Sequence, residues 1–154
     1  VLVTHDPMEA MRVADRIALL REGRLIQFDR PEAFYRQPAD AKVARFFHDF
    51  NELEGIVRRG VVATPVGTFP ANMADGTRVR IMIRPQGLKL DQQGAEASVI
   101  ERRFFGDVDL VRLRLEGLPL TLTAKIPAHE AVLEGDKVRI AASPQHVLVF
   151  PETE

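Results

Sequence analysis

The sequence contains no cysteine, and none of its apolar runs is as long as a membrane span. Without cysteine the chain can form neither disulfide bonds nor thiolate metal sites, which suits a reducing cytoplasm. A membrane-spanning helix needs roughly 20 predominantly apolar residues. We therefore expect no direct membrane insertion, so that any link to a membrane runs through a partner protein.

An excess of one charge sign is also missing, because 21 basic and 22 acidic side chains give a formal net charge of -1. No net field attracts the chain to nucleic acid or anionic lipid, so we expect no nucleic-acid partner. What is present is the composition of an ordinary soluble globular protein, with 45% hydrophobic and 28% charged residues. The 154 residues predict one compact domain with an appendage.

The chain has no charged leader and no apolar signal core, and it opens directly on the apolar residues 1–3. An uninterrupted apolar run is typical of a parallel strand that is covered on both faces. We expect these residues to be the end of a buried strand that belongs to a longer protein. Such an orphan strand exposes unpaired backbone groups, so we expect residues 1–22 to pack against a second chain.

A helix is predicted over residues 7–20. Asp6 is a good N-cap, Pro7 suits the first helical position, and Glu9 completes a capping-box-like pattern. Apolar residues at helical spacing then share one face. They are Met11, Ala14, Ile17 and Ala18.

After a turn at Gly23, the sequence predicts a short strand over residues 24–28. A short helix over residues 31–36 starts at its proline, and a further helix is expected over residues 39–48. From Glu52 onward the apolar period changes to two, which is typical of half-buried strands. We therefore place a domain boundary between residues 1–51 and residues 52–154.

The second half contains several alternating segments separated by glycine turns. The apolar members of the alternation are Val79, Ile81 and Ile83; Val111, Leu113 and Leu115; Leu118, Leu120, Leu122, Ala124 and Ile126; Val138 and Ile140; Val147 and Val149. Many short strands joined by glycine turns predict a small antiparallel barrel or sandwich. The expected fold class is thus mainly β, preceded by an α/β remnant of strand, helix, strand and short helices.

His5 is the candidate chemical residue. It lies between the expected buried strand and the capped helix, where α/β folds place ligand sites. A structural histidine with satisfied hydrogen bonds fits the same position, so spacing alone does not assign a function.

The sequence around His5 resembles a known family. VTHDPMEAMRVADRIALLREGRLIQ, PEAFYRQP and the stretch from Phe46 to Gly55 resemble the end of the ATPase domain of binding-protein-dependent ABC importers. In that family, the histidine of the THD segment is the switch histidine, which contacts the γ-phosphate and helps to hold the hydrolytic water. The resemblance therefore implies this catalytic role for His5.

The second half resembles the transport-associated OB domain, called TOBE. The segments that carry this resemblance are Ile83 to Pro85 with Leu88, Phe105-Gly106, Leu115 to Gly117, Gly135-Asp136 with Val138, and Pro144 through Phe150. The resemblance implies an OB-like antiparallel β-barrel that acts as a regulatory and dimer-forming module. Two departures from the family pattern stand out: Asp29-Arg30 removes the usual threonine cap of the short helix, and His48 replaces a glycine.

The motifs that bind nucleotide are absent from the sequence. It contains no G-x-x-x-x-G-K-[ST] loop, no LSGGQ segment and no strand that ends in a catalytic carboxylate. The resemblance implies ATP and Mg²⁺ as cofactors of the full-length protein, but we expect neither bound to this chain, which alone should be inactive. No metal site is expected either, because His48 and Asp49 are only two ligands.

By the same resemblance, the partners are transmembrane permease subunits and a second ATPase subunit, so a homodimer is expected. The location would be cytoplasmic, peripheral on the inner face of the plasma membrane. The sequence does not indicate the transported solute.

Three alternatives remain open. A stand-alone OB-like small-ligand-binding domain is the main one. A single-stranded nucleic-acid binder could stack bases on Phe104 and Phe105 beside Arg102 and Arg103, although a strand with one buried edge is the simpler interpretation there. A hydrolase built on His5 and Asp6 lacks a nucleophile. We expect Arg84-Pro85 to be architectural, and we assign no role to His129 and His146.

Overall fold

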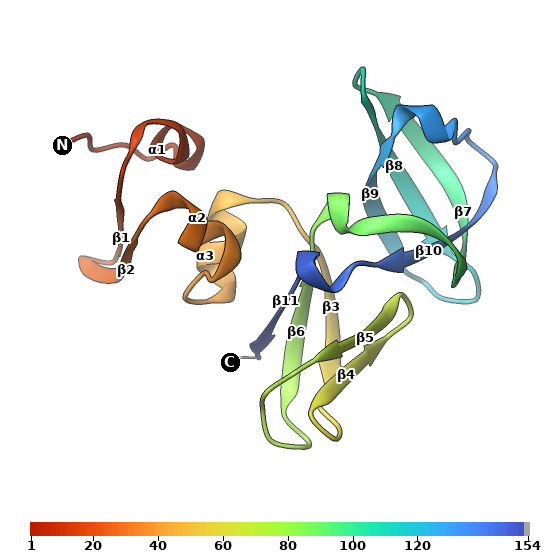
Figure 1. The fold of residues 1–154 in the computed structure, drawn as a ribbon. Helices are drawn as coiled ribbons and strands as arrows, with labels where there is room; N and C mark the ends of the chain where they lie inside the picture. The colour runs from red at the N-terminus through yellow and green to blue at the C-terminus, as the bar shows by residue number, and fades with distance from the viewer. Residues whose placement is uncertain (153–154) are drawn as a thin grey trace. The chain divides into compact units, whose positions relative to one another are not determined.

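A computed structural model describes residues 1–152 of the chain. The chain divides into two compact units, Val1–Asp49 and Phe50–Glu154 (Figure 1). The first unit combines helices with a two-stranded sheet. The second is built from antiparallel strands. Each unit has its own hydrophobic core.

The first unit consists of α1 (Pro7–Val13), β1 (Ile17–Arg21), β2 (Arg24–Asp29), α2 (Pro31–Arg36) and α3 (Ala41–Phe47). Asp6 caps α1, because its carboxylate accepts hydrogen bonds from the backbone N–H groups of Met8 (2.8 Å) and Glu9 (3.2 Å). The strands β1 and β2 pair as an antiparallel hairpin. Its turn residues Glu22 and Gly23 both have positive φ, as a tight hairpin turn requires.

The helix predicted over residues 7–20 ends early. It stops at Val13, and Ile17–Arg21 forms a strand instead. Alternation is the physical reason: Ile17 and Leu19 turn toward the core while Ala18 and Leu20 turn to solvent, and β2 supplies the pairing partner. Residues 1–3 form no paired strand within residues 1–152, and their place in the sheet of a longer protein stays a prediction.

The other predictions for the first unit are confirmed within a few residues. The strand at Arg24–Asp29 and the helix at Pro31–Arg36 are present, and the last helix spans Ala41–Phe47. Asp40 caps this helix by accepting a 2.8 Å hydrogen bond from the backbone of Val43, and it forms an ion pair with Arg21. The core of the first unit is small and contains Ile17, Phe34, Val43 and Phe47.

Within residues 50–152, the second unit contains nine strands and three short 3₁₀ turns. They are β3 (Asn51–Ile56), β4 (Val61–Thr64), β5 (Gly67–Pro70), β6 (Arg78–Ile83), η1 (Pro85–Gly87), β7 (Leu88–Phe104), β8 (Val108–Leu115), β9 (Thr121–Pro127), η2 (Ala128–Glu130), β10 (Lys137–Ala142), η3 (Pro144–His146) and β11 (Val147–Pro151). Three antiparallel sheets result, with strand orders β10-β7-β8-β9, β11-β6-β3 and β4-β5. One continuous core joins side chains from all three sheets.

The strands that the alternation predicted are confirmed in β6, β8, β9, β10 and β11. Leu118 and Leu120 lie before β9 rather than in it. The long strand β7 was not predicted, because its first half carries a polar run around Gln92 and Gln93. In this run β7 makes an excursion from its partner: the pairing jumps from Leu90 with Ile140 to Glu96 with Arg139.

Gly94 permits this excursion. A Cβ atom at residue 94 would lie 2.3 Å from the carbonyl oxygen of Ile140, so only glycine lets β7 approach the backbone of β10 this closely. Figure 1 shows that the long strand β7 bends along its length.

Asn51 links two of the sheets at their edges. Its side-chain amide donates hydrogen bonds to the carbonyl oxygens of Ile83 (3.3 Å) and Thr123 (2.8 Å), and its side-chain oxygen accepts from the N–H of Thr123 (2.7 Å). The amide thereby pairs with β9 as a backbone peptide group would. It ties β3, in one sheet, to β9, in another.

The second unit contains an internal repeat that the sequence analysis did not recognise. RVRIMIRPQGLKL (78–90) resembles KVRIAASPQHVLV (137–149), and each is a strand, a 3₁₀ turn and the start of a strand. The two copies contact each other reciprocally: the N–H of Arg84 donates to the carbonyl of His146 (3.0 Å), and that of Ser143 donates to the carbonyl of Gly87 (2.8 Å). This exchange is the pattern of a pseudo-two-fold axis.

Candidate functional site

His5 lies in an exposed segment just before α1. Both neighbours are held by local hydrogen bonds: Asp6 caps the helix, and the N–H of Asp6 donates to the hydroxyl oxygen of Thr4 (3.0 Å). This short network fixes the backbone on either side of His5 and leaves the imidazole facing solvent. Within the first unit no nucleophile or carboxylate is hydrogen-bonded to it in the described part of the chain.

Arg84 is almost completely buried in the second unit, with its guanidinium 5.2 Å from the ring centroid of Phe50. Its backbone N–H takes part in the reciprocal contact between the two 3₁₀ turns. These contacts fit the architectural role expected for Arg84-Pro85.

His146 has a packing role that the sequence did not suggest. Its side chain covers Gly87, where a Cβ would lie 2.3 Å from the Cβ of His146. The Nδ1 atom is buried and has no hydrogen-bond partner within residues 1–152. Burial lowers the pKa of His146, and the positive charges of Arg84 and Lys89 lower it further.

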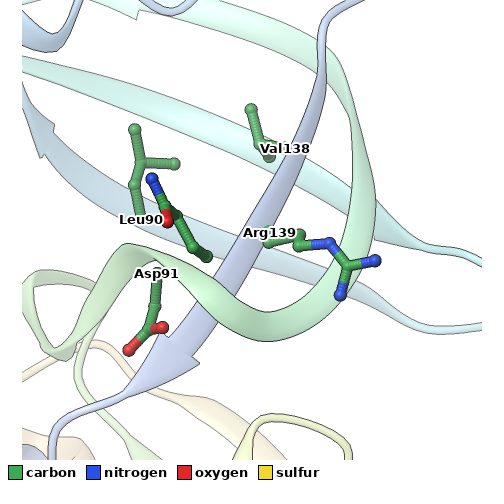
Figure 2. Close-up of a pocket in the computed structure, with 5 residues that line it drawn as sticks. Leu90, Asp91, Val138 and Arg139 are labelled. Carbon is green, nitrogen blue, oxygen red and sulfur yellow. The ribbon is translucent and has the colours of Figure 1, made fainter.

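A groove runs along the outer surface where β7 makes its excursion from β10. It has a volume of about 590 Å³ and is lined by Leu90, Asp91, Gln92, Val138 and Arg139. Figure 2 shows Leu90 and Asp91 on one strand, with Val138 and Arg139 on the strand that crosses it. A second hollow of about 490 Å³ shares Val138 and Arg139 and extends toward Glu116.

Most charges along this groove are already paired. Arg139 forms an ion pair with Glu96, and Lys137 forms one with Glu116. Ser98 donates a hydrogen bond to the same Glu116 carboxylate. The Lys137 ammonium beside it holds the pKa of Glu116 below its usual range. Such a groove can hold a small polar ligand by hydrogen bonds, but its pairing leaves no activated nucleophile or general base.

One expectation about the aromatic residues of the second unit needs correction. Phe104 and Phe105 are both exposed, so this end of β7 does not have the buried edge that we expected. His48 forms the C-cap of α3 and is half-buried, with its ring edge-on to Tyr35 at 4.9 Å between centroids. Among residues 1–152, no group of three or more histidine or acidic side chains is placed to hold a metal ion.

Comparison with known proteins gives a family for the second unit. Residues 81–150 match the family model described as the TOBE domain. The cytoplasmic molybdate-binding protein ModG has a similar fold, with a TM-score of 0.53 at 15% identity over 66% of this chain and 96% of that chain. The fold class is therefore confirmed: an OB-like antiparallel β domain that follows a smaller unit with helices.

The curated relatives are ATP-binding proteins of importers. The chain is 34% identical over 155 residues to the sulfate/thiosulfate import ATP-binding protein CysA of Xanthomonas campestris, covering 98% of this chain and 44% of the relative. It is 37% identical over 121 residues to the Fe(3+) ions import ATP-binding protein FbpC of Streptomyces coelicolor, covering 76% and 34%. The chain therefore spans less than half the length of each of these relatives.

Residues 81–150 of the second unit therefore belong to the TOBE domain family. The chain as a whole is similar to the ATP-binding subunits of ABC importers, and these relatives support the resemblance to the C-terminal part of such a subunit. None of the helices within residues 1–152 is long and apolar enough to cross a membrane.

Sequence reasoning missed the residues that line the groove. Asp91 and Gln92 belong to a polar run whose composition favours a loop. They lie beside Arg139 because Gly94 lets β7 approach the backbone of β10 closely. A glycine within an otherwise continuous stretch was the available signal, since it often marks a close approach of two backbones.

Proposed function

We propose that this chain is part of the ATP-binding subunit of an ABC transporter that imports a solute by ATP hydrolysis. The observation that carries the proposal is the match to CysA over 98% of the chain, because it includes both units. Residues 1–51 would be the end of the ATPase domain and residues 52–154 the regulatory TOBE domain. The subunit would lie in the cytoplasm, bound to transmembrane permease subunits and to a second ATPase subunit.

In this proposal His5 is the switch histidine. Its exposed imidazole donates a hydrogen bond to a γ-phosphate oxygen as negative charge develops in the transition state. The capped start of α1 and the contact of Asp6 with Thr4 support this role, because they orient the segment around His5.

ATP and Mg²⁺ do not fit the residues of this chain alone. The sequence has no phosphate-binding loop, and the described residues offer no cluster of metal ligands. The proposal therefore assigns nucleotide and metal binding to parts of the subunit outside this chain.

The test of His5 uses the complete subunit. We expect His5→Ala to lower ATP turnover by about 100-fold or more while ATP affinity stays close to that of the wild type, since the contact strengthens in the transition state. Turnover is measured by phosphate release and affinity by equilibrium binding. Glu9→Ala, an exposed change in the adjacent helix, serves as the control. Equal loss of binding and turnover would contradict the catalytic role.

The chain of 154 residues should not hydrolyse ATP by itself. His5 alone cannot position the phosphates, coordinate the metal and activate water. Phosphate release by the purified chain is expected to equal the buffer blank, and release above the blank that His5→Ala abolishes would refute this prediction.

The groove between β7 and β10 supports a second candidate function, the binding of a small polar ligand by a stand-alone OB-like domain. Saturation at 100 times the dissociation constant stabilises a protein by about 2.7 kcal/mol. Melting curves with sulfate, Fe³⁺ and spermidine as probes test this function. A rise in melting temperature that Arg139→Ala removes would favour it, and no rise with any probe would count against it.

A further inference from the structure

The end of the second unit where β7 turns into β8 exposes two adjacent aromatic rings. Phe104 is 64% exposed and Phe105 is 63% exposed. Leu133, also exposed, lies in the loop before β10 at the same end, because the backbone N–H of Arg102 donates a 3.1 Å hydrogen bond to the neighbouring Glu134. In Figure 1 the turn between β7 and β8 stands at the top of the second unit, beside the turn that follows β9. A cluster of large exposed apolar side chains marks an interaction surface.

Arg102 is held in a fixed position within this cluster. Its Nε donates a 2.8 Å hydrogen bond to Asp109, whose side chain is only 1% exposed, and its guanidinium lies 5.9 Å from the ring centroid of Phe104. Arg102 itself is 29% exposed. Within residues 1–152 its two terminal nitrogens form no hydrogen bond, so they are oriented donors that are open to a carboxylate.

The same surface also supplies a suitable carboxylate. Glu134 uses only Oε1, which accepts from the backbone of Arg102, and it sits directly beside the apolar Leu133. The surface therefore combines an arginine donor, a carboxylate and apolar side chains. A surface that carries both partners of each contact is complementary to itself, as a two-fold interface requires.

We propose that Arg102, Phe104, Phe105, Leu133 and Glu134, the β7–β8 surface, bind the same surface of a second copy of the chain. The aromatic rings and Leu133 of the two copies pack together at the centre, and Arg102 of each copy donates to Glu134 of the other. Aromatic residues and arginine are the residue types that protein interfaces favour. The inference deepens the proposed function, which includes a second subunit, by naming where the two copies meet.

A nucleic-acid partner fits the same surface less well. Arg103 is paired with Glu101, which also binds Arg112, and Asp107 and Glu134 lie nearby. These acidic groups repel phosphates, so the surface lacks the positive field that single-stranded nucleic acid requires.

The test is the mass of the chain in solution, measured by light scattering over a range of concentrations. We expect a mass that is twice the 17.3 kDa of one chain. Phe104→Ser/Phe105→Ser should return the mass to that of a monomer, with the circular dichroism spectrum of the folded chain unchanged because both rings are exposed. Glu134→Gln keeps the acceptor for Arg102 N–H and should raise the dissociation constant about tenfold.

Leu25→Ser/Phe28→Ser is the matched control, since it removes two exposed apolar side chains from β2 in the first unit. It should leave the dimer intact. A dimer that survives Phe104→Ser/Phe105→Ser overturns the inference but leaves the proposed function standing, and dissociation by the control variant alone would place the contact in the first unit. A monomeric wild-type chain that binds a single-stranded oligonucleotide through Phe104 and Phe105 would overturn it as well.

Discussion

Asn51 is a single buried side chain that joins two sheets of the second unit. A strand at the edge of a sheet leaves backbone groups without partners, and a side-chain amide carries the same donor and acceptor as a peptide group. Asn51 uses this equivalence to bind Thr123 of β9 on both its N–H and its carbonyl. The contact joins residues that are far apart in sequence, which makes it important for the tertiary structure.

We predict that Asn51→Ala lowers the free energy of unfolding by about 2–4 kcal/mol, because it leaves backbone groups of Ile83 and Thr123 buried without partners. Urea unfolding followed by circular dichroism measures the change. Glu54→Ala, an exposed change in the same strand, is the control and should stay within about 0.5 kcal/mol. An equally small effect of Asn51→Ala would mean that β9 is held by core packing alone.

The sequence identified Asn51 as part of a family motif but gave it no physical role. Its partners are more than 30 and 70 residues away, and no local pattern reveals such a contact. His146 escaped notice for the same reason, because its contact with Gly87 follows from the internal repeat. His5, in contrast, was found from its neighbours, since capping is a local property that short segments reveal.

His146 gives the stability of the second unit a pH dependence. Its pKa in the folded chain lies below the usual 6.5, because burial and then Arg84 and Lys89 disfavour the charged imidazole. As the pH falls below 6.5, the pKa of histidine in the unfolded chain, the unfolded chain binds a proton that the folded chain resists. The stability of the folded chain therefore decreases with falling pH. Above this pKa both states are neutral at this residue and the effect vanishes.

We predict that His146→Gln makes the urea midpoint change less between pH 7.5 and 5.5, roughly the range over which histidine titrates. His129→Gln, which replaces an exposed histidine in η2, should leave the pH dependence of the wild type unchanged. An equal effect of the two substitutions would show that the buried environment of His146 is not the cause.

At the scale of elements, the short helix α2 lacks a side-chain cap. Arg30 occupies the N-cap position with extended backbone angles but makes no capping hydrogen bond. This outcome was predicted from the Asp29-Arg30 departure from the family pattern. The helix is nevertheless formed, because Pro31 starts it and Phe34 anchors it in the core.

We predict that Arg30→Thr stabilises the first unit by about 1 kcal/mol, since a threonine hydroxyl can accept from the free N–H groups of the first helical turn. Thermal unfolding of the first unit measures the gain. Arg30→Ala offers no acceptor, so it should give no comparable gain. A similar gain from alanine would attribute the effect to removal of the arginine charge.

Alternation predicted the strands of the second unit well, because a half-buried antiparallel sheet imposes a period of two on each strand. It failed where another constraint dominates. In Ile17–Arg21 the same apolar residues also fit a helix, and only the pairing with β2 decides between the two structures. In β7 the polar run around Gly94 hides a strand that bends around β10.

At the scale of the whole chain, the two units differ in how much apolar surface they bury. In the first unit the core cluster consists of Ile17, Phe34, Val43 and Phe47, with partly buried side chains around them. The core of the second unit extends through all of its sheets and includes Val79, Ile81, Leu113 and Leu122 among many others. Burial of apolar surface is the main stabilising contribution, so the first unit should be the less stable one.

This difference predicts separate unfolding of the two units in hydrogen exchange. Amides of α2 and α3 should exchange faster than amides of β6 and β8, because a small core opens at lower cost in free energy. Phe34→Ala removes a fully buried ring that packs 5.0 Å from Phe47 between centroids. The loss of about 3–5 kcal/mol should unfold the first unit and leave the exchange of β6 and β8 unchanged. Leu113→Ala, in the core of the second unit, should instead accelerate β6 and β8. If Phe34→Ala accelerated exchange equally in both units, the chain would unfold as one cooperative body, and the difference between the two cores would not control its stability.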